Sequence, residues 1–243
     1  MDQGLKFEPL GRGFKIAVSK HHTFGTDAVL LSHFAMATAK DRAVDLGTGC
    51  GIIPLLMLRD KKINIYGVDI SAEAIDLCEI SKAENQAETF FPVNADLKEL
   101  KGKVPFGANT LVTCNPPYKA EGAGLTNPDK TVRTARHETE CTMSDIVFVG
   151  AKLLQTGGRL CMCQRPERAA ELICLMHENK VEPKRMRFVS KCVGEKPWLV
   201  LVEGRRSGKV GLIVEPELYL YDNKGNLTAE MIEIYGEYKK NFL

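Results

Sequence analysis

Apolar residues gather along this chain in short runs, and between the runs apolar and polar positions alternate with the spacing of a helix. The apolar runs have the length of buried strands and lie at residues 43–46, 63–68, 89–93, 110–114 and 159–163. Helical spacing follows at residues 52–58, 72–83, 144–155 and 167–178. Strands and helices that alternate in this way predict a mostly parallel sheet with helices on both faces.

Two more apolar runs, at residues 187–193 and 198–203, are expected to pair as strands and to close one edge of the sheet. The sheet would then have seven strands in a doubly wound, Rossmann-like α/β fold. Ser144 is expected to cap the N-terminus of its helix, which Gly157-Gly158 would end.

The chain length of 243 residues predicts one domain with a large core and additions at both ends. Its parts would be an N-terminal extension and helix at 1–40, a binding core at 41–180, and sheet-closing strands with a C-terminal helix at 181–243. Apolar residues make up 44% of the chain and charged residues 26%, as in globular proteins. No apolar run approaches the roughly 20 residues that span a bilayer, and no signal-peptide core is present. We therefore expect a cytoplasmic protein without a membrane partner, and favour a monomer.

Eight cysteines are scattered along the chain, and no pair has C-x-x-C spacing. Several lie inside apolar runs, which predicts buried thiols in a reducing compartment. We expect neither disulfides nor a metal site.

Positive charge is concentrated in residues 181–210, where eight basic residues face three acidic ones. Lys184, Arg185 and Arg187 are the candidates there for contact with the phosphates of a nucleic acid. The long stretch at 118–143 has little periodicity and carries Arg133 and Arg136, so we expect a substrate loop. For both basic groups, a solvated face stays the alternative.

A glycine-rich turn over Asp45–Gly51 follows the first predicted strand. Its glycines stand at 47, 49 and 51, in the pattern D-x-G-x-G-x-G with Thr48 between the first two. A dinucleotide fingerprint would need a glycine at 52, which is Ile52. Glycines here let the backbone approach a ligand at the start of a helix.

Two acidic residues lie at the ends of the next predicted strands. Asp69 ends the second strand, where a carboxylate can accept hydrogen bonds from both ribose hydroxyls. Asp96 comes just after the third strand and can meet an adenine amino group. With the glycine-rich turn, they predict a site for a ligand that contains a nucleoside.

Asn115-Pro116-Pro117-Tyr118 follows the fourth predicted strand. The asparagine offers a side-chain oxygen as acceptor, the prolines fix the backbone, and the tyrosine offers a flat face for stacking. Together they predict a rigid pocket for a planar group with an exocyclic amine.

In this order, Asp45–Gly51, Asp69, Asp96 and Asn115–Tyr118 resemble the class I S-adenosylmethionine-dependent methyltransferases that methylate amino groups. Residues 24–31, 135–138 and 215–218 extend the likeness to the bacterial tRNA adenine-N6 methyltransferases, which act on the adenine 3′ of the anticodon in a valine tRNA. Glu217 departs from the family, in which a proline is expected, in a surface segment.

The resemblance implies S-adenosylmethionine as cofactor, tRNA as partner and an antiparallel strand at the sheet edge. It also implies that Asp69 binds the ribose, that Asp96 lies near the adenine, and that Thr26 and Asp27 lie near the methionine moiety of the cofactor.

The predicted pocket suggests how an amine would be activated. The Asn115 side-chain oxygen and the Pro116 carbonyl would accept the two amine protons and free the nitrogen lone pair. Tyr118 would stack on the base and align it with the methyl donor, without an obligatory general base. A base stacked in an anticodon loop would have to be turned out, at a cost of a few kcal/mol.

Other substrates for this chemistry stay open. A glutamine side chain of a peptide release factor presents the same planar NH2, although such enzymes carry a large helical domain before the glycine-rich strand and this chain has only some 40 residues there. Guanine N2 in ribosomal RNA is another option. A non-catalytic S-adenosylmethionine- or RNA-binding module is the alternative from a different class, against which the intact Asn115 and Tyr118 argue.

Overall fold

The structure is a computed structural model, and it describes residues 5–116 and 141–236. One mixed sheet of nine strands forms its centre. Its strands are β3 (Arg42–Leu46), β4 (Asn64–Asp69), β5 (Phe90–Asn94), β6 (Asn109–Cys114), β7 (Leu154–Gln164), β8 (Val181–Ser190), β9 (Leu199–Arg206), β10 (Ile213–Val214) and β11 (Leu218–Tyr219).

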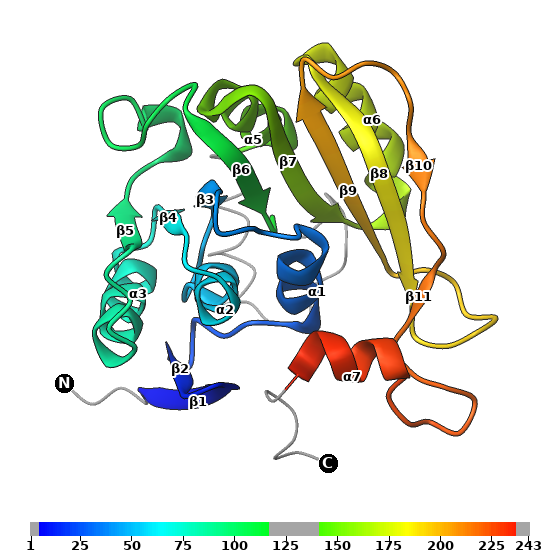
Figure 1. Cartoon of the computed structure of the whole chain (residues 1–243), viewed down its shortest axis with the longest axis horizontal. Coiled ribbons are helices and arrows are strands. Elements are labelled where there is room, and N and C mark those ends of the chain that lie inside the picture. The colour runs from blue at the N-terminus through cyan, green and yellow to red at the C-terminus, as the bar shows by residue number, and fades with distance from the viewer. Residues whose placement is uncertain (1–4, 117–140, 237–243) are drawn as a thin grey trace, which may run out of the picture.

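The order β10-β8-β9-β7-β6-β3-β4-β5 places β3 at the middle of the parallel part, with β11 also paired to β8 (Figure 1). This confirms the predicted α/β fold with a mostly parallel sheet. Two details differ from the prediction. The two-residue strands β10 and β11 raise the number of strands above seven, because pieces so short leave no apolar pattern. The antiparallel strand, β9, lies between β7 and β8 and not at the edge.

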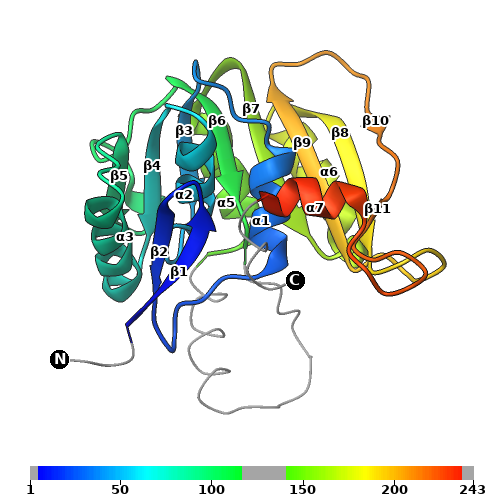
Figure 2. The same cartoon turned by 60° about the horizontal axis from the view of Figure 1, so that its bottom comes forward.

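Helices cover both faces of the sheet, each over its own apolar cluster. One face carries α1 (Thr26–Phe34), α2 (Ile52–Asp60), α3 (Ala72–Glu84), α7 (Ala229–Tyr235) and the hairpin of β1 (Lys6–Gly11) and β2 (Phe14–Val18). The other carries α5 (Met143–Leu153) and α6 (Ala169–Glu178) (Figure 2). No helix in the described ranges is long and apolar enough to span a membrane. The division of the chain at residues 41 and 181 stays a prediction.

The start of α5 corrects the expected cap at Ser144. Thr142 caps the helix, since its hydroxyl accepts the Asp145 N–H at 3.2 Å and the Asp145 carboxylate accepts the Thr142 N–H at 2.9 Å. This reciprocal pair leaves no N-terminal role for Ser144.

The end of α5 was also wrongly predicted. The helix ends at Leu153, and Gly157-Gly158 lies inside β7. The register of β7 against β6 shifts there, and Gly157 adopts a φ of +81°. A bulge therefore uses the glycines that were expected to end the helix.

β8 begins at Val181, six residues before the prediction. Pro183 and the charged residues after it hide the strand pattern, and the register shifts between Pro183 and Arg185. A proline is tolerated at such a bulge near the sheet edge.

Candidate active site

The glycine-rich turn joins β3 to α2 at the carboxyl edge of the sheet. Gly47, Gly49 and Gly51 have φ angles of +69°, +55° and +85°, which disfavour other residues. A Cβ at Gly51 would lie 2.9 Å from Cys78 Sγ and 3.2 Å from Phe90 Cζ, so this glycine also permits close packing. At Gly47 and Gly49, no atom of the described residues lies within 4 Å of the Cβ position, apart from the glycine itself and its two neighbours in the chain. The first two glycines therefore present an open backbone surface.

Asp69, at the end of β4, ties the glycine-rich turn to the start of α3. Its Oδ2 accepts the Gly49 N–H at 2.8 Å, and its Oδ1 accepts the Ser71 N–H at 2.9 Å. Each carboxylate oxygen has a second lone pair for a ligand. The Asp69 carbonyl accepts the Ala95 N–H at 3.0 Å, which holds the loop with Asp96 beside this strand end. Asp96 itself caps a short 3-10 helix by accepting the Lys98 N–H at 2.8 Å.

Asp45 is buried beneath the glycine-rich turn. Its Oδ1 accepts a hydrogen bond of 2.6 Å from Thr113 Oγ1. Burial raises the pKa of Asp45 to about 7, the negative charge of Asp69 adds to the rise, and the hydroxyls of Thr113 and Thr48 oppose it. Asp45 Oδ2 and Thr48 Oγ1 are both buried, and neither forms a well-directed hydrogen bond to another described residue.

Such unsatisfied polar atoms are costly. A polar, positively charged group bound at the open turn would compensate this carboxylate, and the ammonium group of S-adenosylmethionine is one. The residues of the turn thus fit the predicted cofactor.

The Asn115 side chain, at the end of β6, is held from two sides. Its Nδ2 donates to Asp27 Oδ2 at 3.1 Å, and its Oδ1 accepts from Cys163 Sγ at 3.1 Å. Asp27 is in the first turn of α1 and Cys163 near the end of β7, so three distant parts of the sequence meet here. Pro116 is buried beside them. Pro117, Tyr118, Arg133 and Arg136 lie outside the described residues.

Thr26 begins α1 and contacts α7, with 3.0 Å between its Oγ1 and the Tyr235 hydroxyl. The role of Thr26 near the methionine moiety stays a prediction.

The basic residues on β8 are engaged within the fold. Arg185 forms ion pairs with Glu215 (2.7 Å) and Glu203 (2.9 Å), and its guanidinium lies over the Phe34 ring. Arg187 binds Glu230 at 2.6 Å.

Lys184, also on β8, donates to the Lys209 carbonyl at 3.0 Å. Two exposed lysines of the same basic segment, Lys191 and Lys196, follow β8. Val200 of β9 pairs with both Gln164 of β7 and Phe188 of β8, so β8 ends at the same edge as β7 and Asn115.

Residues 19–181 match the family model of the "Methyltransferase small domain". The chain belongs to this family. Among curated relatives, the tRNA1(Val) (adenine(37)-N6)-methyltransferase of Parabacteroides distasonis is 28% identical over 74% of this chain and 75% of its own length. The protein of the same name from Tolumonas auensis is 25% identical over 88% of each chain. A predicted O-methyltransferase of Agrobacterium tumefaciens has a similar fold, with a TM-score of 0.71, 18% identity, and coverage of 88% of this chain and 97% of that chain.

Membership of the methyltransferase small domain family confirms the predicted class, and S-adenosylmethionine is the cofactor that this family and the fitted turn support. Within the described ranges, no group of three or more histidine, cysteine or acidic side chains could hold a metal ion. The contacts that Asp27 and Cys163 make with Asn115 were not predicted. Cys163 was interpreted as one of several core thiols. Its position at the end of a predicted strand, at the sheet edge where Asn115 was also expected, is the sequence signal that could have indicated this contact.

Proposed function

We propose that this methyltransferase transfers a methyl group to the N6 amine of an adenine in the anticodon loop of a valine tRNA, in the cytoplasm. The observation that carries the proposal is the placement of Asn115. The strand order puts β6 next to β3, so the amide lies at the same edge as the glycine-rich turn. The names of the relatives at 25–28% identity support adenine in tRNA as the substrate.

In the proposed reaction, the Asn115 Oδ1 and the Pro116 carbonyl accept hydrogen bonds from the target amine. They draw the amine protons away from the plane of the base and leave the nitrogen lone pair available for attack. Pro117 fixes the backbone, and Tyr118 stacks on the base. The bond from the nitrogen to the methyl group would form as the bond from sulfur to that group breaks, and the methylated nitrogen would then release one proton to water. Positioning and polarisation provide the catalysis, so a general base is not required.

Residues of the turn and of the neighbouring strand ends would hold the cofactor. Gly47, Gly49 and Gly51 would let it approach the backbone, Asp69 would accept the ribose hydroxyls, and Asp96 would meet the adenine. Asp45 and Thr48, which belong to the turn, have buried side chains. When bound, S-adenosylmethionine supplies a methyl group on a positively charged sulfur.

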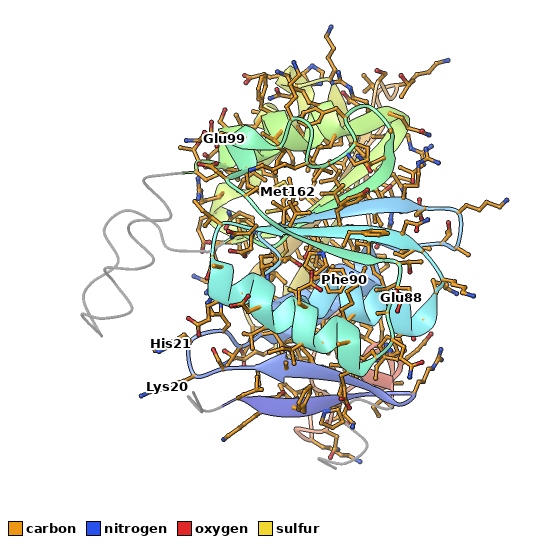
Figure 3. The ribbon with its side chains drawn as sticks, turned by 90° about the vertical axis from the view of Figure 1, so that its left-hand side faces the viewer. Lys20, His21, Glu88, Phe90, Glu99 and Met162 are labelled. Carbon is orange, nitrogen blue, oxygen red and sulfur yellow. The ribbon has the colours of Figure 1, made fainter. Side chains whose placement is uncertain are left out.

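The tRNA backbone would contact lysines around this edge. Lys20, in the loop before α1, is exposed and projects on the same side as Glu99, which follows β5 (Figure 3). Lys191 and Lys196 are exposed after β8. With Arg133 and Arg136 they form our proposed phosphate-binding set. Lys184 lies near the start of β8, toward the opposite edge of the sheet, and donates to the Lys209 carbonyl. The ion pairs of Arg185 and Arg187 favour a role within the fold.

Incubation of the protein with methyl-labelled S-adenosylmethionine and bacterial tRNA, followed by nucleoside analysis, tests the proposal. Labelled N6-methyladenosine in valine tRNA is the expected product, and Asn115→Ala is the inactive control. Label on guanine N2 in ribosomal RNA, or on a glutamine of a release factor, would show that the proposed substrate is wrong and that the proposed methylation of an amino group is right. If no label is transferred to any of these pools, the proposed activity is wrong.

A further inference from the structure

Asp27 makes the contact that determines which way the Asn115 amide faces. A carboxylate is only an acceptor, so the amide must turn its NH2 group toward Asp27 Oδ2, at 3.1 Å. The thiol of Cys163 agrees with this orientation, because it donates to the Asn115 Oδ1 at 3.1 Å. The reversed amide would place two oxygens together at the Asp27 side and would turn its NH2 group toward the Cys163 sulfur, which is a weak acceptor.

Gly25 leaves room for this position of the Asp27 carboxylate. Its φ of −114° and ψ of 174° are available to any residue, so backbone strain does not require glycine. A Cβ at Gly25 would instead overlap the Asp27 Oδ1. The missing side chain leaves the space in which the Asp27 carboxylate folds back over the chain.

We propose that Asp27 is a positioning residue for methyl transfer, which holds the Asn115 amide so that its Oδ1 is presented to the target amine. The inference rests on the proposed amine methylation, and it differs from the place near the methionine moiety that the resemblance implies for Asp27. Hydrogen bonds in a chain polarise one another, so the carboxylate on the NH2 group also makes Oδ1 a stronger acceptor. Asp27 acts through Asn115 and does not itself contact the amine.

Steady-state kinetics of Asp27→Ala test the proposal. We expect kcat to fall about 10- to 100-fold, because a misplaced acceptor loses transition-state alignment, while the Kd for S-adenosylmethionine and the KM for tRNA change less than about 2-fold. Asp27→Asn should recover part of kcat, since its amide oxygen can accept the same N–H. Gly25→Ala should lower kcat by displacing the carboxylate. Asp76→Ala, an exposed carboxylate on α3, is the charge-matched control and should stay at wild-type activity.

A double-mutant cycle separates positioning from an independent role. In an Asn115→Ser background, which has no amide to orient, Asp27→Ala should change kcat less than about 2-fold. If the double variant instead loses kcat by the product of the fold-losses of the two single variants, the proposal is overturned. A rise in the Kd for S-adenosylmethionine that matches the loss of kcat would overturn it as well, since Asp27 would then be a cofactor ligand.

The side-chain NH2 resonances of Asn115, observed by NMR in the isotope-labelled protein, provide a readout without turnover. They should shift in Asp27→Ala and stay in place in Asp76→Ala. Unshifted resonances in Asp27→Ala would show that the hydrogen bond is absent and would overturn the proposal. If the wild-type protein transfers no methyl group, the proposed function fails while this spectrum still tests the contact.

Discussion

The cofactor side and the amine side of the candidate site are built differently. On the cofactor side, the turn after β3 and the strand ends of β4 and β5 are held together by hydrogen bonds from backbone N–H groups, two of which, from Gly49 and Ser71, go to the Asp69 carboxylate. On the amine side, Asn115 depends on the side chains of Asp27 and Cys163 from distant elements. Changes on the cofactor side should therefore alter affinity and stability. Changes on the amine side should alter turnover.

Asn115→Ala should give the largest effect and the sharpest separation of the two sides. It removes the proposed side-chain acceptor, and losing such a group costs about 100- to 1000-fold in kcat. The Kd for S-adenosylmethionine should stay within about 2-fold, which calorimetric titration can measure. A loss of affinity as large as the loss of activity would show that the two sides are not separate.

Asp45→Asn should show how much the buried Asp45 carboxylate lowers the free energy of unfolding. Unfolding restores an ordinary aspartate, whose pKa is near 3.8, whereas burial in the folded protein raises the pKa to about 7. Between pH 4 and pH 7, Asp45 therefore keeps its proton in the folded state and loses it in the unfolded state. The free energy of unfolding falls as the pH rises from about 4 to about 7. At pH 8 the full penalty is up to about 4 kcal/mol. Asparagine removes it while its side-chain oxygen can still accept from Thr113.

The cofactor-free Asp45→Asn protein should thus gain stability over wild type at pH 8 and little at pH 4, as measured by urea unfolding. Its affinity for S-adenosylmethionine at pH 8 should fall about 10-fold, because a neutral amide does not compensate a cation. An equal stability difference at both pH values would contradict the raised pKa of Asp45.

Lys191→Glu combined with Lys196→Glu should give the smallest effect, confined to the nucleic acid. The KM for tRNA should rise several-fold, and the salt dependence of binding should weaken in proportion to the lost phosphate contacts. Cofactor affinity and the free energy of unfolding should stay near wild type, since both side chains are exposed. Arg187→Glu is the contrasting variant. It breaks the ion pair with Glu230 and should lower stability. Unchanged tRNA binding in the lysine variant would show that Lys191 and Lys196 do not contact the tRNA phosphates.

Local patterns were sufficient for much of the fold and of the cofactor side. Apolar runs located β3 to β6, and glycine spacing located the turn, because both signals lie within a few neighbouring residues. The errors fell where local signals compete. Gly157-Gly158 is compatible with a helix end or a bulge, and only the pairing of β7 with β6 selects the bulge. A phosphate contact of the charged residues on β8, with a solvated face as the alternative, stays a prediction. In the fold, two of them are paired with Glu203, Glu215 and Glu230.

Patterns along the chain were enough to predict the class of fold, the glycine-rich turn, and the order of Asp45, Asp69, Asp96 and Asn115 at successive strand ends. The way in which Asn115 is held depends on the folded chain, because residues 27, 115 and 163 meet through the packing of α1 and β7 around β6. The packing of the whole chain matters in the same way elsewhere in the site. It also decided that Asp45 is buried with an unsatisfied oxygen, since the burial of a carboxylate depends on all the elements that surround it. Short-range patterns specify strands and turns, whereas hydrogen-bond partners and pKa values depend on contacts between distant segments.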